Sequence, residues 1–175
     1  MVYIAVAASL MTVCSWISLP SVVPITMQMF AIFVTLGILG GKIGSTAVFL
    51  YVAIGVLGVP VFSHFKGGLP IIISDVAGGY IVGFLFVALI YWGAEAIFGN
   101  KFCVKLCSML AGLVVCYAVG VLWYVRINLN ASVALGFADV MSVCVIPFVL
   151  PDIIKLAMAL FLTHKLKRHI NVSCK

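Results

Sequence analysis

Long apolar runs alternate with short polar or glycine-rich breaks along this chain. The first run, residues 1–41, contains no charged side chain and is longer than the ~20 residues with which a helix crosses a bilayer. A break at 18–24, with Pro20 and Pro24, divides this run in two, because proline interrupts a helix. The pattern is typical of a chain that crosses a membrane several times.

The positions of the breaks predict an all-α integral membrane protein with six membrane-spanning helices. The predicted helices cover residues 2–19, 25–40, 45–62, 77–98, 104–125 and 151–167. Glycine-containing turns separate the second helix from the third and the fourth from the fifth, since glycine tolerates a positive φ. Pro151 marks the start of the last helix, because proline is favoured in a first turn. We expect one domain over residues 1–175.

The segment 131–149 is also apolar but contains Asp139, so we interpret it as an interfacial connection. A seventh helix there is the alternative, and the basic residues argue against it because cytoplasmic loops are enriched in Lys and Arg. With six helices and both termini in the cytoplasm, the cytoplasmic side carries Lys42, Lys101, Lys105, Lys165, Lys167, Arg168 and Lys175. The outer side then carries Lys66 and Arg126. The segments that face outward are 20–24, 63–76 and 126–150.

Composition excludes two broad classes of protein. Apolar residues make up 66% of the 175 residues and charged residues only 8%, whereas soluble domains are about a quarter charged. A soluble globular domain is therefore excluded, since no core of this size could hide so much apolar surface. The net charge of +6 comes from basic residues scattered between apolar runs, so we expect a lipid bilayer and not a nucleic acid as the surrounding partner.

Targeting, metal and enzyme signals are weak or absent from the sequence. Residues 1–11 contain no Lys or Arg, so we interpret the first run as a retained helix and not as a signal peptide. Cys103 and Cys107 have no histidine or second cysteine pair nearby, so we expect no metal site. The chain has no P-loop and no catalytic nucleophile motif, so we expect neither ATP hydrolysis nor another enzymatic activity.

The sharpest chemical signal is the pair of Asp152 and Lys155. These residues are three apart, so they share one face of the last predicted helix. An ionisable residue at membrane depth costs about 2.5–3.5 kcal/mol, which makes a functional role the default interpretation. The carboxylate would accept hydrogen bonds from ligand N–H groups, and the ammonium would donate one to a ligand oxygen. The alternative is a pair that only neutralises itself.

Three weaker signals lie elsewhere in the chain. Glycines at 67–68 and 78–79 precede Tyr80 and allow a close backbone approach or a re-entrant loop, or else simply close helix packing. Gln28 near the start of the second helix either caps it or faces a cavity. Ala5 and Ser9 are four residues apart, a spacing of small residues that lets another helix come close.

Six segments of the chain carry short ordered motifs: residues 20–28, 40–44, 51–62, 67–68, 78–84 and 147–155. In this order they resemble the biotin-specific S components (the BioY family) of energy-coupling factor transporters. Together they cover nearly the whole chain, and their ordered set is specific although each short pattern alone is not. The resemblance implies the six-helix S-component fold in a bacterial cytoplasmic membrane. It also implies capture of biotin from the outer side and closure of a lid formed by 63–76.

The resemblance also implies roles for individual residues and for partner proteins. Asp152 and Lys155 would be pocket residues, with Tyr80 and Gly79 on the opposite wall. Ala5 and Ser9 would contact a transmembrane coupling protein of the EcfT type, which two cytoplasmic ABC-type ATPases drive. Gln28 belongs to the first of the six segments and is included among the expected ligand contacts.

The chain departs from the family pattern at the expected lid. Lys66 stands where family members often have Asn, and residues 75–77 read Asp-Val-Ala where Gly-Pro followed by Thr or Ser is common. Our hypothesis is that Lys66 meets the biotin carboxylate, while Lys155 contacts either the ureido oxygen or Asp152. Alternative functions are an S component for another small vitamin and a purely structural membrane subunit or small channel.

Overall fold

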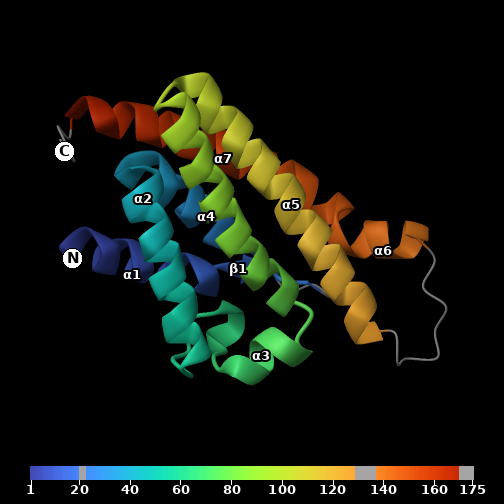
Figure 1. The fold of residues 1–175 in the computed structure, drawn as a ribbon. Coiled ribbons are helices and arrows are strands. Elements are labelled where there is room, and N and C mark those ends of the chain that lie inside the picture. Colours follow the sequence, from blue (N-terminus) through green and yellow to red (C-terminus); the bar gives the residue numbers. More distant parts are fainter. Residues whose placement is uncertain (20–22, 129–136, 170–175) are drawn as a thin grey trace.

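The computed structural model describes residues 1–19, 23–128 and 137–169, and within the last range the side chains of 140–166. The elements in chain order are α1 (Val2–Trp16), β1 (Ser18–Leu19), β2 (Ile25–Thr26), α2 (Gln28–Val56), η1 (Ser63–Phe65), α3 (Leu69–Ser74), α4 (Gly78–Phe98), α5 (Phe102–Asn128), α6 (Phe137–Cys144) and α7 (Ile146–His169). Figure 1 shows α1, α4 and α7 gathered around α2, with α5 alongside α4.

The long helix α2 takes the place of the second and third predicted helices, and it ends at Val56, before the predicted end of the third at residue 62. Gly40 interrupts α2 with a φ of 80° and a ψ of 171°, a backbone conformation that glycine adopts readily and other residues rarely adopt. The two halves pack against each other beside the interruption, because a Cβ on Gly44 would lie 3.0 Å from the Leu36 Cα. With α2 counted as two spans, the helices α1, α2, α4, α5 and α7 account for the six predicted helices, and the predicted fold class is confirmed.

The first two predicted helices extended too far into the break between them. Helix α1 ends at Trp16, and Ile17 is already extended. Ser18 pairs with Thr26 in a two-stranded antiparallel hairpin, and Leu19 pairs with Ile25. Strands of two residues leave too few positions for an alternating pattern, so the sequence could not reveal them.

The last predicted helix begins earlier than expected. Helix α7 starts at Ile146, and Pro151 lies inside it and not in its first turn. The backbone N–H of Phe148 bonds to the Val145 carbonyl at 2.9 Å, so α6 continues almost directly into α7. Helix α6 has eight residues and rises only ~12 Å, so it is too short to be a seventh span. Residues 129–136 and the Asp139 side chain lie outside the described residues.

Four described helical stretches are long and apolar enough to cross a membrane. They are residues 28–56, 78–98, 102–128 and 140–166, and α1 is a shorter apolar helix of 15 residues.

Close packing of α4 on α5 depends on glycine. A Cβ on Gly83 would lie 3.1 Å from the Cys116 Cα, and one on Gly112 would lie 3.1 Å from the Val87 Cα.

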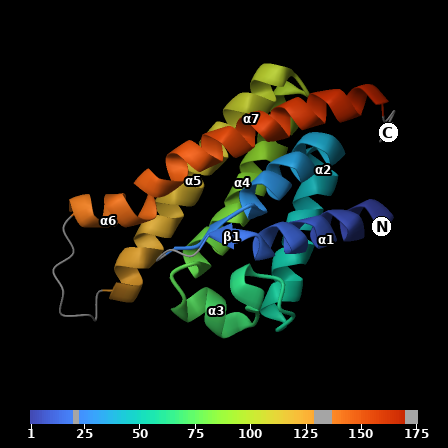
Figure 2. The same ribbon diagram turned by 180° about the vertical axis from the view of Figure 1, so that it is seen from behind.

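The segment that joins α2 to α4, residues 57–77, forms the rim of one end of the molecule. It contains η1 and the six-residue helix α3, and Figure 2 shows it below α1 and the hairpin. The turn between α4 and α5 lies at the opposite end (Figure 1). There the Glu95 carboxylate accepts hydrogen bonds from the Gly41 backbone N–H and from Asn100 Nδ2.

Candidate binding pocket

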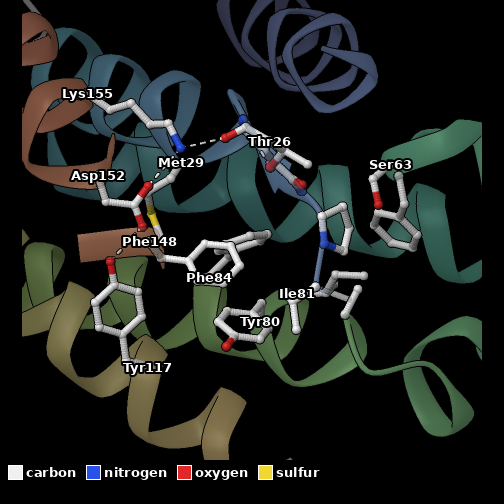
Figure 3. A pocket seen from close by; sticks show the side chains of 15 residues that line it. Thr26, Met29, Ser63, Tyr80, Ile81, Phe84, Tyr117, Phe148, Asp152 and Lys155 are labelled. Atoms are coloured by element: carbon white, nitrogen blue, oxygen red, sulfur yellow. Dashed lines mark hydrogen bonds and ion pairs between the residues drawn. The ribbon is translucent and has the colours of Figure 1, made fainter. Parts of the chain in front are cut away.

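A buried ion pair forms the floor of a cavity near the middle of the bundle. Lys155 Nζ lies 2.8 Å from Asp152 Oδ1, and the side chains are only 7% and 5% exposed. Lys155 Nζ also donates to the Thr26 carbonyl at 2.8 Å, which links α7 to the hairpin (Figure 3). The spacing of three residues on α7 brings both charges to one face, as the sequence predicted.

A tyrosine that the sequence did not single out forms a third member of this site. Tyr117 on α5 donates a hydrogen bond to Asp152 Oδ2 at 2.7 Å. Figure 3 shows Asp152 between Lys155 on one side and Tyr117 on the other. Each carboxylate oxygen thus has one protein donor, and a carboxylate has lone pairs for more. The contact joins two residues 35 positions apart in the sequence, and no local spacing could have predicted it.

The cavity above this floor has a volume of about 50 Å³. Its walls are mostly apolar and include Met29, Ile81, Phe84 and Phe148, and its rim includes Phe62, Ser63 and Ala77. Pockets for small molecules usually measure about 300–1,000 Å³. A ligand of vitamin size therefore needs side chains or the rim segment to move outward.

Tyr80 lines the cavity with its ring and not with its hydroxyl. The ring lies 5.7 Å from that of Phe148 between centroids, at an interplanar angle of 30°. The hydroxyl donates to the Cys144 carbonyl at 2.7 Å, where α6 meets α7. Tyr80 therefore offers an apolar wall, and its position depends on the end of α6.

Gly79 does not line the cavity. A Cβ at this position would lie 2.3 Å from the Trp123 Cβ, so Gly79 packs against α5. Gly120 on α5 likewise makes room for Tyr80 on α4, because a Cβ at Gly120 would lie 2.6 Å from the Tyr80 ring. Gly79 and Gly120 thus let α4 approach α5 and place the tyrosine ring, which is the packing alternative that the sequence left open.

Gln28 lines the cavity from the first turn of α2 and is 3% exposed. Its Nε2 donates to the Tyr51 hydroxyl at 2.8 Å, and that hydroxyl donates to the Val61 carbonyl at 2.8 Å. Of the two alternatives that the sequence left open for Gln28, this placement agrees with the one in which it faces a cavity. Tyr51 is 1% exposed and was not identified from the sequence.

Lys66 lies on the rim segment and is not among the residues that line the cavity. Its Nζ is 2.6 Å from Asp75 Oδ2, and the side chains are 46% and 24% exposed. Burial alone would raise the pKa of Asp75, but the hydrogen bond and charge of Lys66 and the Ala77 N–H together hold this pKa below its ordinary value. Two positions at which the chain departs from the family pattern are therefore partners.

Ala5 and Ser9 lie on the exposed face of α1, away from the pocket. The opposite face of α1, with Ala7, Ala8 and Met11, is buried in the core. Cys103 and Cys107 are exposed on α5. Within the part of the chain that the structure describes, no group of three or more His, Cys, Asp or Glu residues could hold a metal ion.

Comparison with known proteins agrees on one family. A family model described as the BioY family matches residues 1–172. The biotin transporter BioY of Thermotoga maritima is 37% identical over 164 residues, which cover 91% of this chain and 90% of the relative. The probable biotin transporter BioY of Pyrococcus horikoshii is 34% identical over 146 residues, which cover 83% and 81%.

The fold is similar to that of a solved structure, the S-component for biotin from an ECF-type ABC transporter at 2.1 Å. The TM-score is 0.79 at 23% identity, over 95% of this chain and 89% of that one. At this identity the match shows a shared fold, and the six-helix arrangement described above is therefore an S-component fold.

Proposed function

The chain belongs to the BioY family, and on that premise we propose that it is a membrane-embedded subunit that binds biotin for uptake. It is a multi-pass membrane protein, and its named relatives are transporters and not enzymes. The single observation that carries the proposal is the buried Asp152–Lys155 pair at the floor of an otherwise mostly apolar cavity.

The polar groups of the floor complement those of biotin. Its ureido ring has two N–H donors and one carbonyl acceptor, and its thiophane ring is apolar. The Asp152 oxygens retain lone pairs beyond the bonds from Lys155 and Tyr117, so they can accept from a ureido N–H. Two of the three Lys155 protons go to Asp152 and to the Thr26 carbonyl, and the third can go to the ureido oxygen. Phe84, Phe148 and Tyr80 would pack against the thiophane ring.

Entry of biotin would begin with outward movement of the rim segment. Phe62, Ser63 and Ala77 belong to this segment or flank it, and they cover the cavity. Once biotin occupies the site, the segment would close over it as the lid expected from the sequence. In this scheme the Lys66–Asp75 pair would stabilise the rim before the ligand arrives, and Lys66 would exchange Asp75 for the ligand once it is bound.

Lys66 is also the proposed partner of the biotin carboxylate. The Lys66 side chain is half exposed, and a lysine side chain is long and flexible. Lys66 can therefore leave Asp75 and bind a ligand carboxylate at the rim. Titration of wild type and Lys66→Ala with biotin and biotin amide tests this role. Wild type should prefer biotin over its amide and the variant should not, whereas unchanged affinities for both ligands in the variant would refute it.

We further propose the orientation and partners implied by the family. Both termini would face the cytoplasm of a bacterial cell, and the rim segment would face outward. The exposed residues Ala5 and Ser9 of α1 would contact an EcfT-type coupling protein, driven by two ABC-type ATPases. Replacement of either residue by Leu should reduce co-purification with the coupling protein and leave biotin binding unchanged, because both lie away from the pocket.

Calorimetric titration of the detergent-solubilised chain tests the binding function. Biotin should saturate one site per chain, and desthiobiotin, which keeps the ureido ring, should compete. Thiamine and riboflavin should not. Absence of biotin binding in a folded sample, or displacement of biotin by thiamine or riboflavin, would contradict the proposal and favour another vitamin.

A further inference from the structure

A chain of hydrogen bonds runs from the cavity to the rim segment. It begins at Gln28, whose Nε2 donates to the Tyr51 hydroxyl, and continues from that hydroxyl to the Val61 carbonyl. Ser15 Oγ on α1 also donates to the Val61 carbonyl, at 2.6 Å. Tyr51 is fully buried, and its ring meets that of Phe62 edge to face at 5.8 Å.

The direction of these bonds fixes the orientation of the Gln28 amide. A tyrosine hydroxyl has one proton, and Tyr51 gives it to the Val61 carbonyl at 2.8 Å. Its oxygen is then an acceptor toward Gln28, and the amide nitrogen faces Tyr51. The amide oxygen, Oε1, is left on the other side of the amide. The described residues supply no donor to it, and Gln28 lines the cavity, which leaves the cavity as the source of a donor for this oxygen.

We propose that Tyr51 is a positioning residue that determines ligand specificity by holding the Gln28 oxygen toward the cavity. The pocket then presents a neutral acceptor on α2 as well as the charged acceptor Asp152 on α7. Two acceptors with one donor, Lys155, match a cyclic urea, which has two N–H groups and one carbonyl oxygen. This inference rests on the proposed function and deepens it, because it assigns the second N–H of the ligand a partner.

The arrangement also excludes ligands. An amide oxygen facing the cavity repels a carboxylate or another carbonyl oxygen placed beside it, because neither group can donate a hydrogen bond. The ureido end of biotin is therefore the end that lies at Gln28. The carboxylate end must lie elsewhere, toward the rim.

Tyr51→Phe tests the inference, because it removes the hydroxyl and keeps the ring. We expect about tenfold weaker biotin binding, the effect of one hydrogen bond that no longer orients the amide. Gln28→Leu should weaken binding by a similar factor. The double variant should be no weaker than Gln28→Leu alone, since Tyr51 acts through Gln28. Methylation of the ureido nitrogen that meets Gln28 should weaken binding to wild type by the same factor. In either variant the methyl group should weaken binding little further, because the hydrogen bond is already lost.

Tyr91→Phe is the matched control. Tyr91 is equally buried, and its hydroxyl has no hydrogen-bond partner among the described residues. Removal of this hydroxyl should leave biotin affinity and ligand preference unchanged. Thermal unfolding of each variant checks that it folds. Titration of Gln28→Leu with two biotins, each methylated at one of the two ureido nitrogens, tests the amide oxygen without altering Tyr51.

The outcomes separate the inference from the proposed function. Wild type that fails to bind biotin would overturn the proposed function. Wild-type binding with unchanged affinity in Tyr51→Phe would overturn the inference alone. An equal loss from Tyr51→Phe in the presence and absence of Gln28 would also overturn it, because Tyr51 would then act through the Val61 carbonyl of the rim and not through the amide.

Discussion

The molecule contains two aspartate–lysine pairs of similar geometry in opposite surroundings. The pair on the cavity floor, Asp152 and Lys155, has an N–O distance of 2.8 Å and is almost completely buried. The pair on the rim, Lys66 and Asp75, has a distance of 2.6 Å, and its side chains are 46% and 24% exposed. Judged by distance alone, the rim pair would have the stronger electrostatic interaction. Because the floor pair is buried, the attraction between its charges is the stronger of the two.

The difference follows from what surrounds each charge. Water and salt screen the rim pair, so a pair of this kind contributes about 0–1 kcal/mol. The floor pair has lost its water, and each charge depends on fixed partners: Tyr117, the Thr26 carbonyl and the opposite charge. Such a pair adds little to stability compared with apolar residues, but removing one partner is costly. We therefore expect the floor to determine binding and the rim to adjust it.

The largest expected effect is the removal of one charge from the floor. Asp152→Ala leaves the Lys155 ammonium buried without its counter-charge and should lower the free energy of unfolding by about 3–5 kcal/mol. The double variant Asp152→Asn/Lys155→Met should recover most of this loss, since no uncompensated charge remains. Denaturant unfolding in detergent measures both. Equal losses in the single and double variants would contradict the claim that an uncompensated buried charge causes the loss.

The next effect concerns the third member of the floor. Tyr117→Phe removes the hydrogen bond to Asp152 Oδ2 and leaves the ring in place. A hydrogen bond to a charged group contributes about 1.5–3 kcal/mol, so biotin affinity should fall at least tenfold. Calorimetric titration measures the change, with Tyr91→Phe as the control that should bind normally. Unchanged affinity in Tyr117→Phe would mean that Asp152 is oriented by Lys155 alone.

A steric substitution tests how firmly the rim is fixed to the bundle. A Cβ on Gly55 would lie 2.1 Å from Phe62 Cζ, so Gly55→Ala must displace a side chain that lines the cavity. Overpacking of this kind costs about 1–3 kcal/mol, and biotin should dissociate faster from the disturbed pocket. Gly93→Ala is the control, because beyond its own stretch of helix no atom of the described residues lies within 4 Å of its Cβ position. Dissociation rates that match in the two variants would show that Phe62 has no part in retaining the ligand.

The smallest effect is expected at the rim pair and depends on pH. The pKa of Asp75 is lowered in the folded protein, so its contribution to stability is present above its ordinary value of about 4 and is lost as pH falls through the lowered value. This contribution should stay below about 1 kcal/mol and shrink with added salt. Thermal unfolding of wild type and Asp75→Asn between pH 7 and pH 3 measures it. A constant difference between the two across this range would contradict the assignment.

The floor was predictable from the sequence because local spacing determines it. Two charges three residues apart in an apolar helix must share a face, and membrane depth makes them expensive. The sequence also marked Gln28 as a polar residue at a helix start, but it left open whether Gln28 caps the helix or faces a cavity. Gly40 was expected to end a helix, and it does so by its positive φ inside α2.

The partners of these residues were not predictable, because they come from other helices. Tyr117 reaches Asp152, and Tyr51 reaches Gln28, across distances in sequence that only the packed bundle closes. Gly79 differs from these residues. The resemblance implies a place on the pocket wall, whereas in the structure Gly79 packs against Trp123 of α5 and is not among the residues that line the cavity.

The most direct test of the account is one titration performed on two proteins side by side. Wild type and Asp152→Asn/Lys155→Met, both shown to be folded by thermal unfolding, are titrated with biotin in detergent. The account predicts saturable binding at one site per chain in wild type and no binding at micromolar biotin in the variant. Equal affinity in the two proteins would contradict the claim that the buried pair on α7 holds the ligand.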